Sequence, residues 1–93
     1  MTVRAYTVCE GDMVAFLLAD APAGAQVEGT KDPLTTHEAI GVFHKIALQD
    51  IAAGAIVHRG GWPIGRATAD IPAGAHVHTH NLVSTYSTSK ETQ

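Results

Sequence analysis

The densest chemical feature of the sequence is a run of three alternating histidines that ends on an asparagine, His76-Val77-His78-Thr79-His80-Asn81. In an extended strand successive side chains point to opposite faces, so the three imidazoles would share one face. Neighbours on one face lie about 6.5 Å apart, which puts the outer pair about 13 Å apart. Imidazole nitrogen binds Zn²⁺ at about 2.1 Å, so at most two of the three can hold one ion. The run therefore predicts half of a metal site.

A pair of strand histidines suits Zn, Fe(II) or Mn, but the site needs a third ligand from elsewhere in the chain. The residues that offer one are His44, His58, Asp70 and Glu38. The alternative interpretation of the histidine run is a polar strand face that is exposed to water and binds nothing.

His44 and Lys45 open an apolar stretch, Ile46-Ala47-Leu48. At such a strand start they are candidates for a general acid or base, and the alternative is a pair that faces solvent. His37 lies in a loop-like stretch and is assigned no role. Cys9 stands beside Glu10, whose charge disfavours a thiolate, so Cys9 is predicted to be structural.

Nucleotide-binding motifs are absent from the sequence: no glycine-rich phosphate loop follows any expected strand. The segment Gly60-Gly61-Trp62-Pro63-Ile64-Gly65 is instead expected to be a connection between two strands. Its tryptophan, Trp62, is a candidate interface residue.

Length and composition bound the class of protein. A chain of 93 residues holds one domain, and its formal net charge of −3 argues against nucleic-acid and membrane-surface binding. The longest near-apolar run, Met13–Ala19, is too short to span a bilayer, and no signal-peptide pattern opens the chain, so we expect a cytoplasmic location. Alanine accounts for 15 of the hydrophobic residues. The core should be thin, which favours a partner or a homo-oligomer.

One phrase occurs three times, as Asp20–Val27, Asp50–Val57 and Asp70–Val77. The aspartate of each phrase is expected to cap a single helical turn, and the glycine at its fifth position to end that turn in the left-handed conformation. An extended segment should follow each turn.

Alternating apolar residues predict strands elsewhere in the chain. Val3–Val8 and Asp12–Leu18 should form a hairpin, and the other expected strands are His44–Leu48, Ala55–His58, Ile64–Thr68 and Ala75–Leu82. The prediction is a mostly β domain over residues 1–83 with short one-turn helices. The segment Ser84–Gln93 is predicted to be a polar tail without fixed structure.

The segments Phe43–Gly54 and Pro63–Asn81 resemble the small SAF-type module of the altronate and galactarate dehydratases, and the likeness extends over about residues 3–83. The resemblance implies a SAF-type β-clip fold. It also implies a hydro-lyase that removes water by β-elimination from a sugar acid such as altronate or galactarate, or from a related 2-hydroxy acid. The implied cofactor is a divalent metal, Fe(II) in the first place and Mn(II) or Zn(II) as alternatives.

In that resemblance the metal ligands are drawn from His76, His78 and His80, and the catalytic groups are His44, Lys45 and Asn81. A large catalytic subunit would complete the site, since the related sulfolactate sulfo-lyases occur as separate small and large subunits. One departure is Phe43, where the family usually has glycine. The alternative function is a non-catalytic, self-associating SAF module that binds a small carboxylate or a metal.

Overall fold

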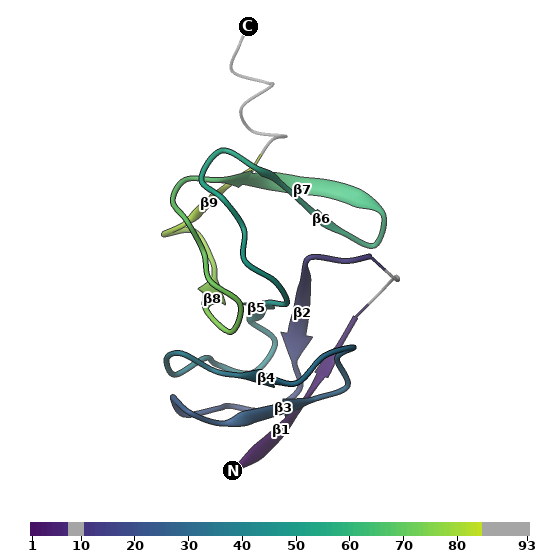
Figure 1. The fold of residues 1–93 in the computed structure, drawn as a ribbon, viewed down its shortest axis with the longest axis vertical. Helices are drawn as coiled ribbons and strands as arrows, with labels where there is room; N and C mark the ends of the chain where they lie inside the picture. Colours follow the sequence, from purple (N-terminus) through teal and green to yellow (C-terminus); the bar gives the residue numbers. More distant parts are fainter. Residues whose placement is uncertain (8–10, 85–93) are drawn as a thin grey trace, which may run out of the picture.

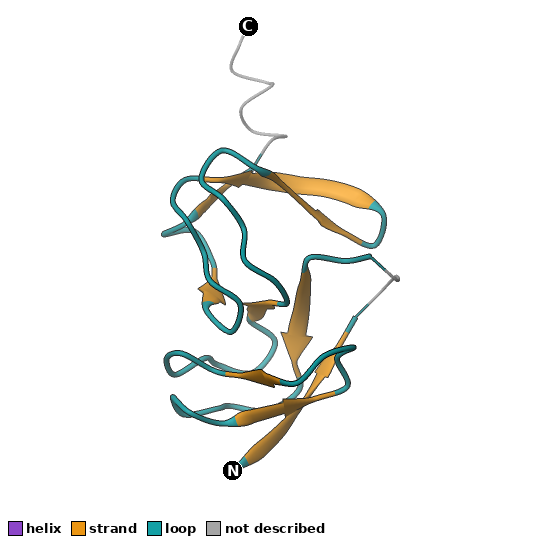
Figure 2. Ribbon diagram, viewed as in Figure 1, coloured by secondary structure: helices purple, strands orange, loops and turns teal. Residues whose placement is uncertain are grey.

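The computed structural model describes residues 1–7 and 11–84, and within these ranges it contains strands, turns and no helix (Figures 1 and 2). The strands are β1 (Thr2–Tyr6), β2 (Val14–Leu17), β3 (Gln26–Glu28), β4 (Leu34–Thr35), β5 (Lys45–Ala47), β6 (Ile56–Arg59), β7 (Trp62–Ala67), β8 (His76–Val77) and β9 (Leu82–Val83). The mostly β prediction is confirmed. Nothing in the described ranges forms an apolar helix of membrane-spanning length.

The strands form two sheets: the smaller one lies at one end of the molecule's long axis, and the larger one extends from the middle to the other end (Figure 1). The larger sheet has the order β4-β3-β1-β2-β5-β8, and the smaller one has the order β6-β7-β9. The predicted hairpin is confirmed, because β1 pairs antiparallel with β2 and places Ala5 opposite Leu17. Residues 8–10 of its turn, Cys9 among them, lie outside the described residues, as do residues 85–93 of the predicted tail.

The smaller sheet is built on a tight hairpin. Gly60 and Gly61 have φ of 65° and 81°, the positive values that a two-residue hairpin turn requires, and they place Arg59 opposite Trp62. The prediction that the whole of Gly60–Gly65 is a connection is therefore wrong, since β7 begins at Trp62. Because Gly60 and Gly61 complete the turn by themselves, the residues from Trp62 onward pair with β6.

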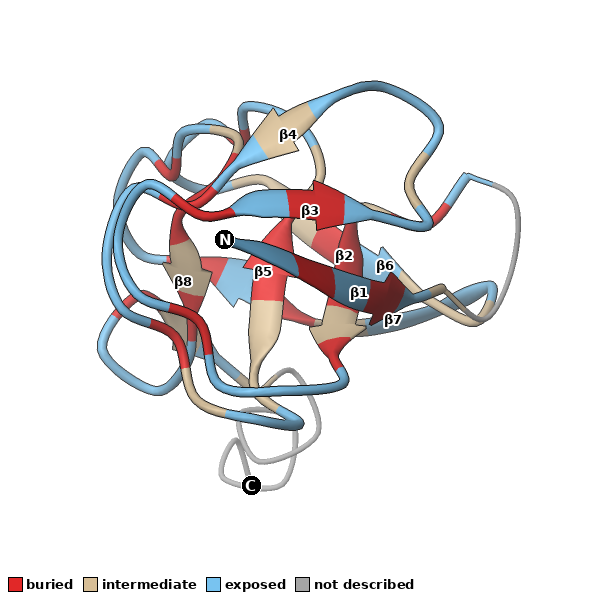
Figure 3. Ribbon diagram, turned by 90° about the horizontal axis from the view of Figure 1, so that it is seen from below, coloured by how far each residue is buried: buried red, intermediate tan, exposed pale blue. Residues whose placement is uncertain are grey.

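The core consists of small side chains, as the composition predicted. Seven of the seventeen buried apolar residues are alanine, and no aromatic residue of the described ranges is buried. One cluster is centred on Leu17 and Ile46, and a second on Val57 and Val77. Viewed from below, β1, β2, β3 and β5 each carry buried residues and lie close together (Figure 3).

The repeated phrases form turns that cap one another, which corrects the predicted one-turn helices. The Asp50 carboxylate accepts a hydrogen bond from the Ala73 amide, and the Asp70 carboxylate accepts one from the Ala53 amide, each at 2.9 Å. Between them Ile51 and Ile71 form an antiparallel bridge. Each aspartate thus caps the turn of the other phrase instead of its own, because the bridge lays the two phrases side by side.

The first phrase, Asp20–Val27, also packs against a second turn, but that turn does not have the repeated sequence. Ala21 bridges Ile40, and the Asp20 carboxylate accepts a hydrogen bond from the Val42 amide at 2.8 Å. The His44 amide donates to the Gly41 carbonyl at 3.1 Å, the same turn-closing bond that joins Ala55 to Ala52 and Ala75 to Pro72. Residues 40–44 are therefore a fourth copy of the turn.

Candidate metal centre

Three imidazoles from distant parts of the chain converge at one edge of the larger sheet. His44 ends the fourth turn just before β5, His76 lies in β8, and His78 follows β8. Because β5 pairs antiparallel with β8 and places Ile46 opposite His76, these side chains come to the same end of the two strands. One nitrogen from each of the three rings lies within 4.8 Å of the others. This arrangement can hold a metal ion.

The rings pack closely. His44 Nδ1 and His76 Nε2 are 2.8 Å apart and share a hydrogen bond. The His44 and His78 rings are stacked with centroids 4.8 Å apart, and His76 and His78 are stacked at 5.4 Å. His44 and His76 are half-buried, whereas His78 is exposed, so the cluster opens toward solvent on one side.

The straight strand predicted through His80 is wrong. β8 ends at Val77, and the chain turns so that the Asn81 amide donates to the His78 carbonyl at 3.1 Å. The turn returns the His80 ring to 5.4 Å from that of His76, centroid to centroid, instead of the far end of a strand. His76 and His78 therefore supply the strand half of the cluster, and His44 supplies the third ring.

Asn81 holds the backbone of the cluster. Its side chain is buried; Oδ1 accepts a hydrogen bond from the His78 amide at 2.9 Å, and Nδ2 donates to the His76 carbonyl at 2.8 Å. Both ends of the amide are thus engaged with the two histidines' main chain. This geometry indicates that Asn81 positions the imidazoles.

The local electrostatics favour neutral imidazole. Burial lowers the pKa of His76, and the nearby rings of His44, His78 and His80 lower it further. The Glu38 carboxylate, which accepts a hydrogen bond from the His76 amide at 3.2 Å, opposes this shift. A ring must be neutral to coordinate a metal, so this lowering of the pKa favours the form of His76 that can bind an ion.

Lys45 lies on the other face of β5 from this cluster. It pairs with Phe16 in the antiparallel register, whereas the next residue, Ile46, pairs with His76, and adjacent residues of a strand face opposite sides. Lys45 Nζ is 5.6 Å from the centre of the Phe16 ring, and Arg59 Cζ is 4.8 Å from the same point. Burial, followed by the charge of Arg59, lowers the pKa of Lys45.

The other residues singled out from the sequence lie outside the cluster. His58 is exposed in β6, Asp70 caps the Ala53 turn, and the His37 amide donates to the Gly74 carbonyl. Trp62 has 68% of its surface exposed at the start of β7. Of the four proposed third ligands, the structure brings only His44 into the group.

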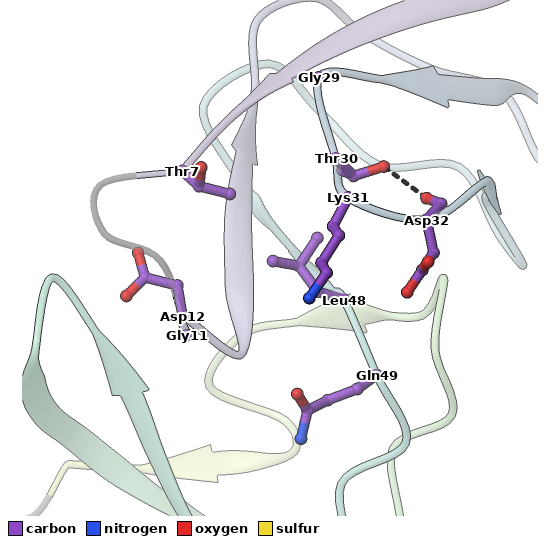
Figure 4. A pocket seen from close by; sticks show the side chains of 9 residues that line it. All are labelled: Thr7, Gly11, Asp12, Gly29, Thr30, Lys31, Asp32, Leu48 and Gln49. Atoms are coloured by element: carbon purple, nitrogen blue, oxygen red, sulfur yellow. Dashed lines mark hydrogen bonds between the residues drawn. The ribbon is translucent and has the colours of Figure 1, made fainter.

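A cavity of about 510 Å³ lies at the opposite end of β5 from His44 (Figure 4). Its polar lining includes Asp12, Lys31 and Gln49. Thr30 lies at its edge and donates a hydrogen bond to the Asp32 carbonyl at 2.7 Å. No imidazole lines this cavity, so it is separate from the candidate metal centre.

Sequence reasoning missed two features around the centre. The fourth turn has Ala39, Phe43 and His44 where the repeated phrase has aspartate, glycine and alanine, so self-comparison does not detect it. The one available signal was Phe43, at the position where the resemblance noted from the sequence leads us to expect glycine. The stacking of Lys45 and Arg59 on Phe16 has no sequence signal, since it depends on strand register.

Comparison with known proteins gives consistent matches. The sequence matches the family described as the Altronate/galactarate dehydratase SAF domain over residues 4–85. Over 70 residues it is 49% identical to an altronate dehydratase of Escherichia coli (strain K12) and 36% identical to an altronate dehydratase of Bacillus subtilis (strain 168). Each alignment covers 75% of this chain and 14% of the relative.

Proposed function

Because this chain belongs to the SAF-domain family of the altronate and galactarate dehydratases, we propose that it is the metal-holding module of a hydro-lyase. The reaction would be β-elimination of water from a sugar acid such as altronate or galactarate, or from a related 2-hydroxy acid. The observation that supports this proposal most is the convergence of His44, His76 and His78 within 4.8 Å.

The donor set fits a divalent metal. Ligand atoms held at about 2.1 Å in a tetrahedral arrangement lie about 3.4 Å apart, and the three imidazole nitrogens all lie within 4.8 Å of one another. Three neutral nitrogen donors suit Fe(II) and Zn(II), and they leave coordination positions open for substrate. The proposed ligands therefore replace the run of three strand histidines with His44 plus two of them.

Groups around His44, His76 and His78 would carry out the proton transfers. A bound divalent ion would stabilise the negative charge that develops on the substrate carboxylate when the neighbouring proton is removed. His80 is exposed and its ring lies against His76, so it is the imidazole best placed to donate or accept a proton outside the trio. Asn81 would keep the two strand histidines in place.

We further propose that a large dehydratase chain completes the active site. The chain spans 14% of the length of the curated relatives that it matches, so most of their sequence has no counterpart in it. The cluster is also open to solvent on the side of His78. A second chain seated there would supply the remaining substrate contacts and exclude water.

The test is reconstitution. The purified chain, loaded with Fe(II), Mn(II) or Zn(II), is assayed for dehydration of altronate and galactarate, alone and mixed with a large dehydratase chain of the same organism. We expect turnover only in the complex, and lower turnover after His78→Ala or His80→Ala. Full turnover of the His76→Ala and His78→Ala complexes would reject the metal centre. Metal binding and self-association of the chain without turnover in any complex would favour the non-catalytic module.

A further inference from the structure

Phe43 occupies a backbone position that the other three copies of the turn reserve for glycine. Its φ is 66°, and the corresponding glycines, Gly24, Gly54 and Gly74, have φ of 84°, 88° and 93°. Among the described residues Phe43 is the one non-glycine residue with positive φ. A bulky side chain in this conformation is strained, and such strain persists mainly where it serves a function.

Most of the Phe43 side chain is not packed against its own domain. It is 69% exposed, although it directly precedes the metal-centre residue His44. The Phe43 amide donates to the Leu17 carbonyl at 2.7 Å, so the backbone of Phe43 lies next to the Leu17–Leu18 segment. Leu18 and Val42 are 48% and 37% exposed. Leu18, Val42 and Phe43 are thus three exposed apolar residues that the backbone brings together next to His44 of the candidate metal centre, and we call them the apolar patch.

We propose that this apolar patch docks onto the large dehydratase chain, with Phe43 as its anchor; this inference rests on the proposed function. Apolar side chains offer no hydrogen bonds to a polar sugar acid. Exposed apolar side chains are instead typical of the surface that becomes the core of a protein–protein interface. Phe43 directly precedes His44 of the cluster, so a chain that completes the site would approach next to the patch. The missing part of the enzyme is large, since the matched segment is 14% of each relative.

The test replaces Phe43 by the photoreactive analogue p-benzoylphenylalanine in the full chain, irradiates it in a lysate of the source organism, and identifies the adduct by mass spectrometry. We expect a polypeptide that aligns with the part of the altronate dehydratases outside the matched segment. Gln49, exposed at the other end of β5, is the matched control position and should give no such adduct. An adduct with a second copy, an adduct with an unrelated protein, or no adduct would overturn the proposal.

A second measurement separates docking from folding. Phe43→Gly suits the positive φ, so the variant should fold and bind metal as the natural chain does, yet bind the large chain at least tenfold more weakly. Unchanged binding and turnover of Phe43→Gly would reject the docking role and leave the proposed function standing. If the natural chain captures no dehydratase chain and His44, His76 and His78 bind no ion, both proposals fail.

Discussion

His44 Nδ1 lies 2.8 Å from His76 Nε2 although 32 residues separate them in the chain. The contact joins the fourth copy of the turn to β8, the strand that ends the third phrase, through the pairing of β5 with β8. Both rings therefore depend on the register of that pair. The candidate metal centre therefore depends on how the turns pack.

Removal of any one ring of the trio should weaken metal binding. We expect His44→Ala, His76→Ala and His78→Ala each to lower Zn²⁺ affinity by at least about tenfold, because two imidazoles remain where three donors converged. Calorimetry measures the affinities. His58→Ala, in an exposed histidine of β6, is the matched control and should bind as the natural chain does. Natural affinity in His44→Ala would show that His44 is no ligand.

Asn81→Ala should act through the backbone. The substitution leaves the His78 amide and the His76 carbonyl without their side-chain partner, which costs about 1–3 kcal/mol when such groups are buried. We expect a lower free energy of unfolding in denaturant and a weaker metal affinity together. Loss of turnover with both quantities unchanged would instead identify Asn81 as a catalytic residue.

Phe43→Gly should be more stable than Phe43→Ala. Both variants remove the phenyl ring, but only glycine adopts a φ of 66° without strain. The left-handed conformation costs other residues about 1–2 kcal/mol, and the greater flexibility of unfolded glycine offsets part of that. A net difference of about 1 kcal/mol corresponds to about 4–8 °C in Tm for a domain of this size. Equal melting temperatures in calorimetry would contradict this account.

Gly74→Ala should destabilise the protein more than Gly54→Ala. Both glycines have positive φ, 93° and 88°, so the backbone strain is matched. A Cβ at position 74 would collide with the Thr35 carbonyl oxygen, whereas at position 54 it would meet nothing within 4 Å. Denaturant titrations of the two variants isolate the collision. Equal losses of stability would mean that strain alone makes glycine necessary here.

Arg59→Gln should raise the pKa of Lys45 toward its usual value of 10.5 without reaching it, because burial is the larger cause of the shift. The unfolded chain binds more protons than the folded one between the lowered pKa and 10.5, so Lys45 makes the free energy of unfolding rise with pH in that window. In Arg59→Gln the free energy of unfolding should rise less with pH in this window. NMR titration of the lysine side chains gives the pKa. The control is Arg4→Gln, which removes an arginine outside the group of Lys45, Phe16 and Arg59 and should leave the pKa of Lys45 unchanged.

The sequence alone determined the class of fold, the hairpin of β1 and β2, the thin alanine-rich core and the turns with their glycines. Strand alternation and left-handed glycines are local properties that a single chain displays directly. The same locality made the histidine run visible as half of a metal site, and a long specific segment identified the family.

Only the tertiary structure decided which imidazoles meet. The sequence predicted a straight strand through His80, but the turn held by Asn81 ends β8 at Val77. The third ring comes from His44, and its partner is set by the pairing of β5 with β8. That pairing is long-range register, which no local pattern encodes.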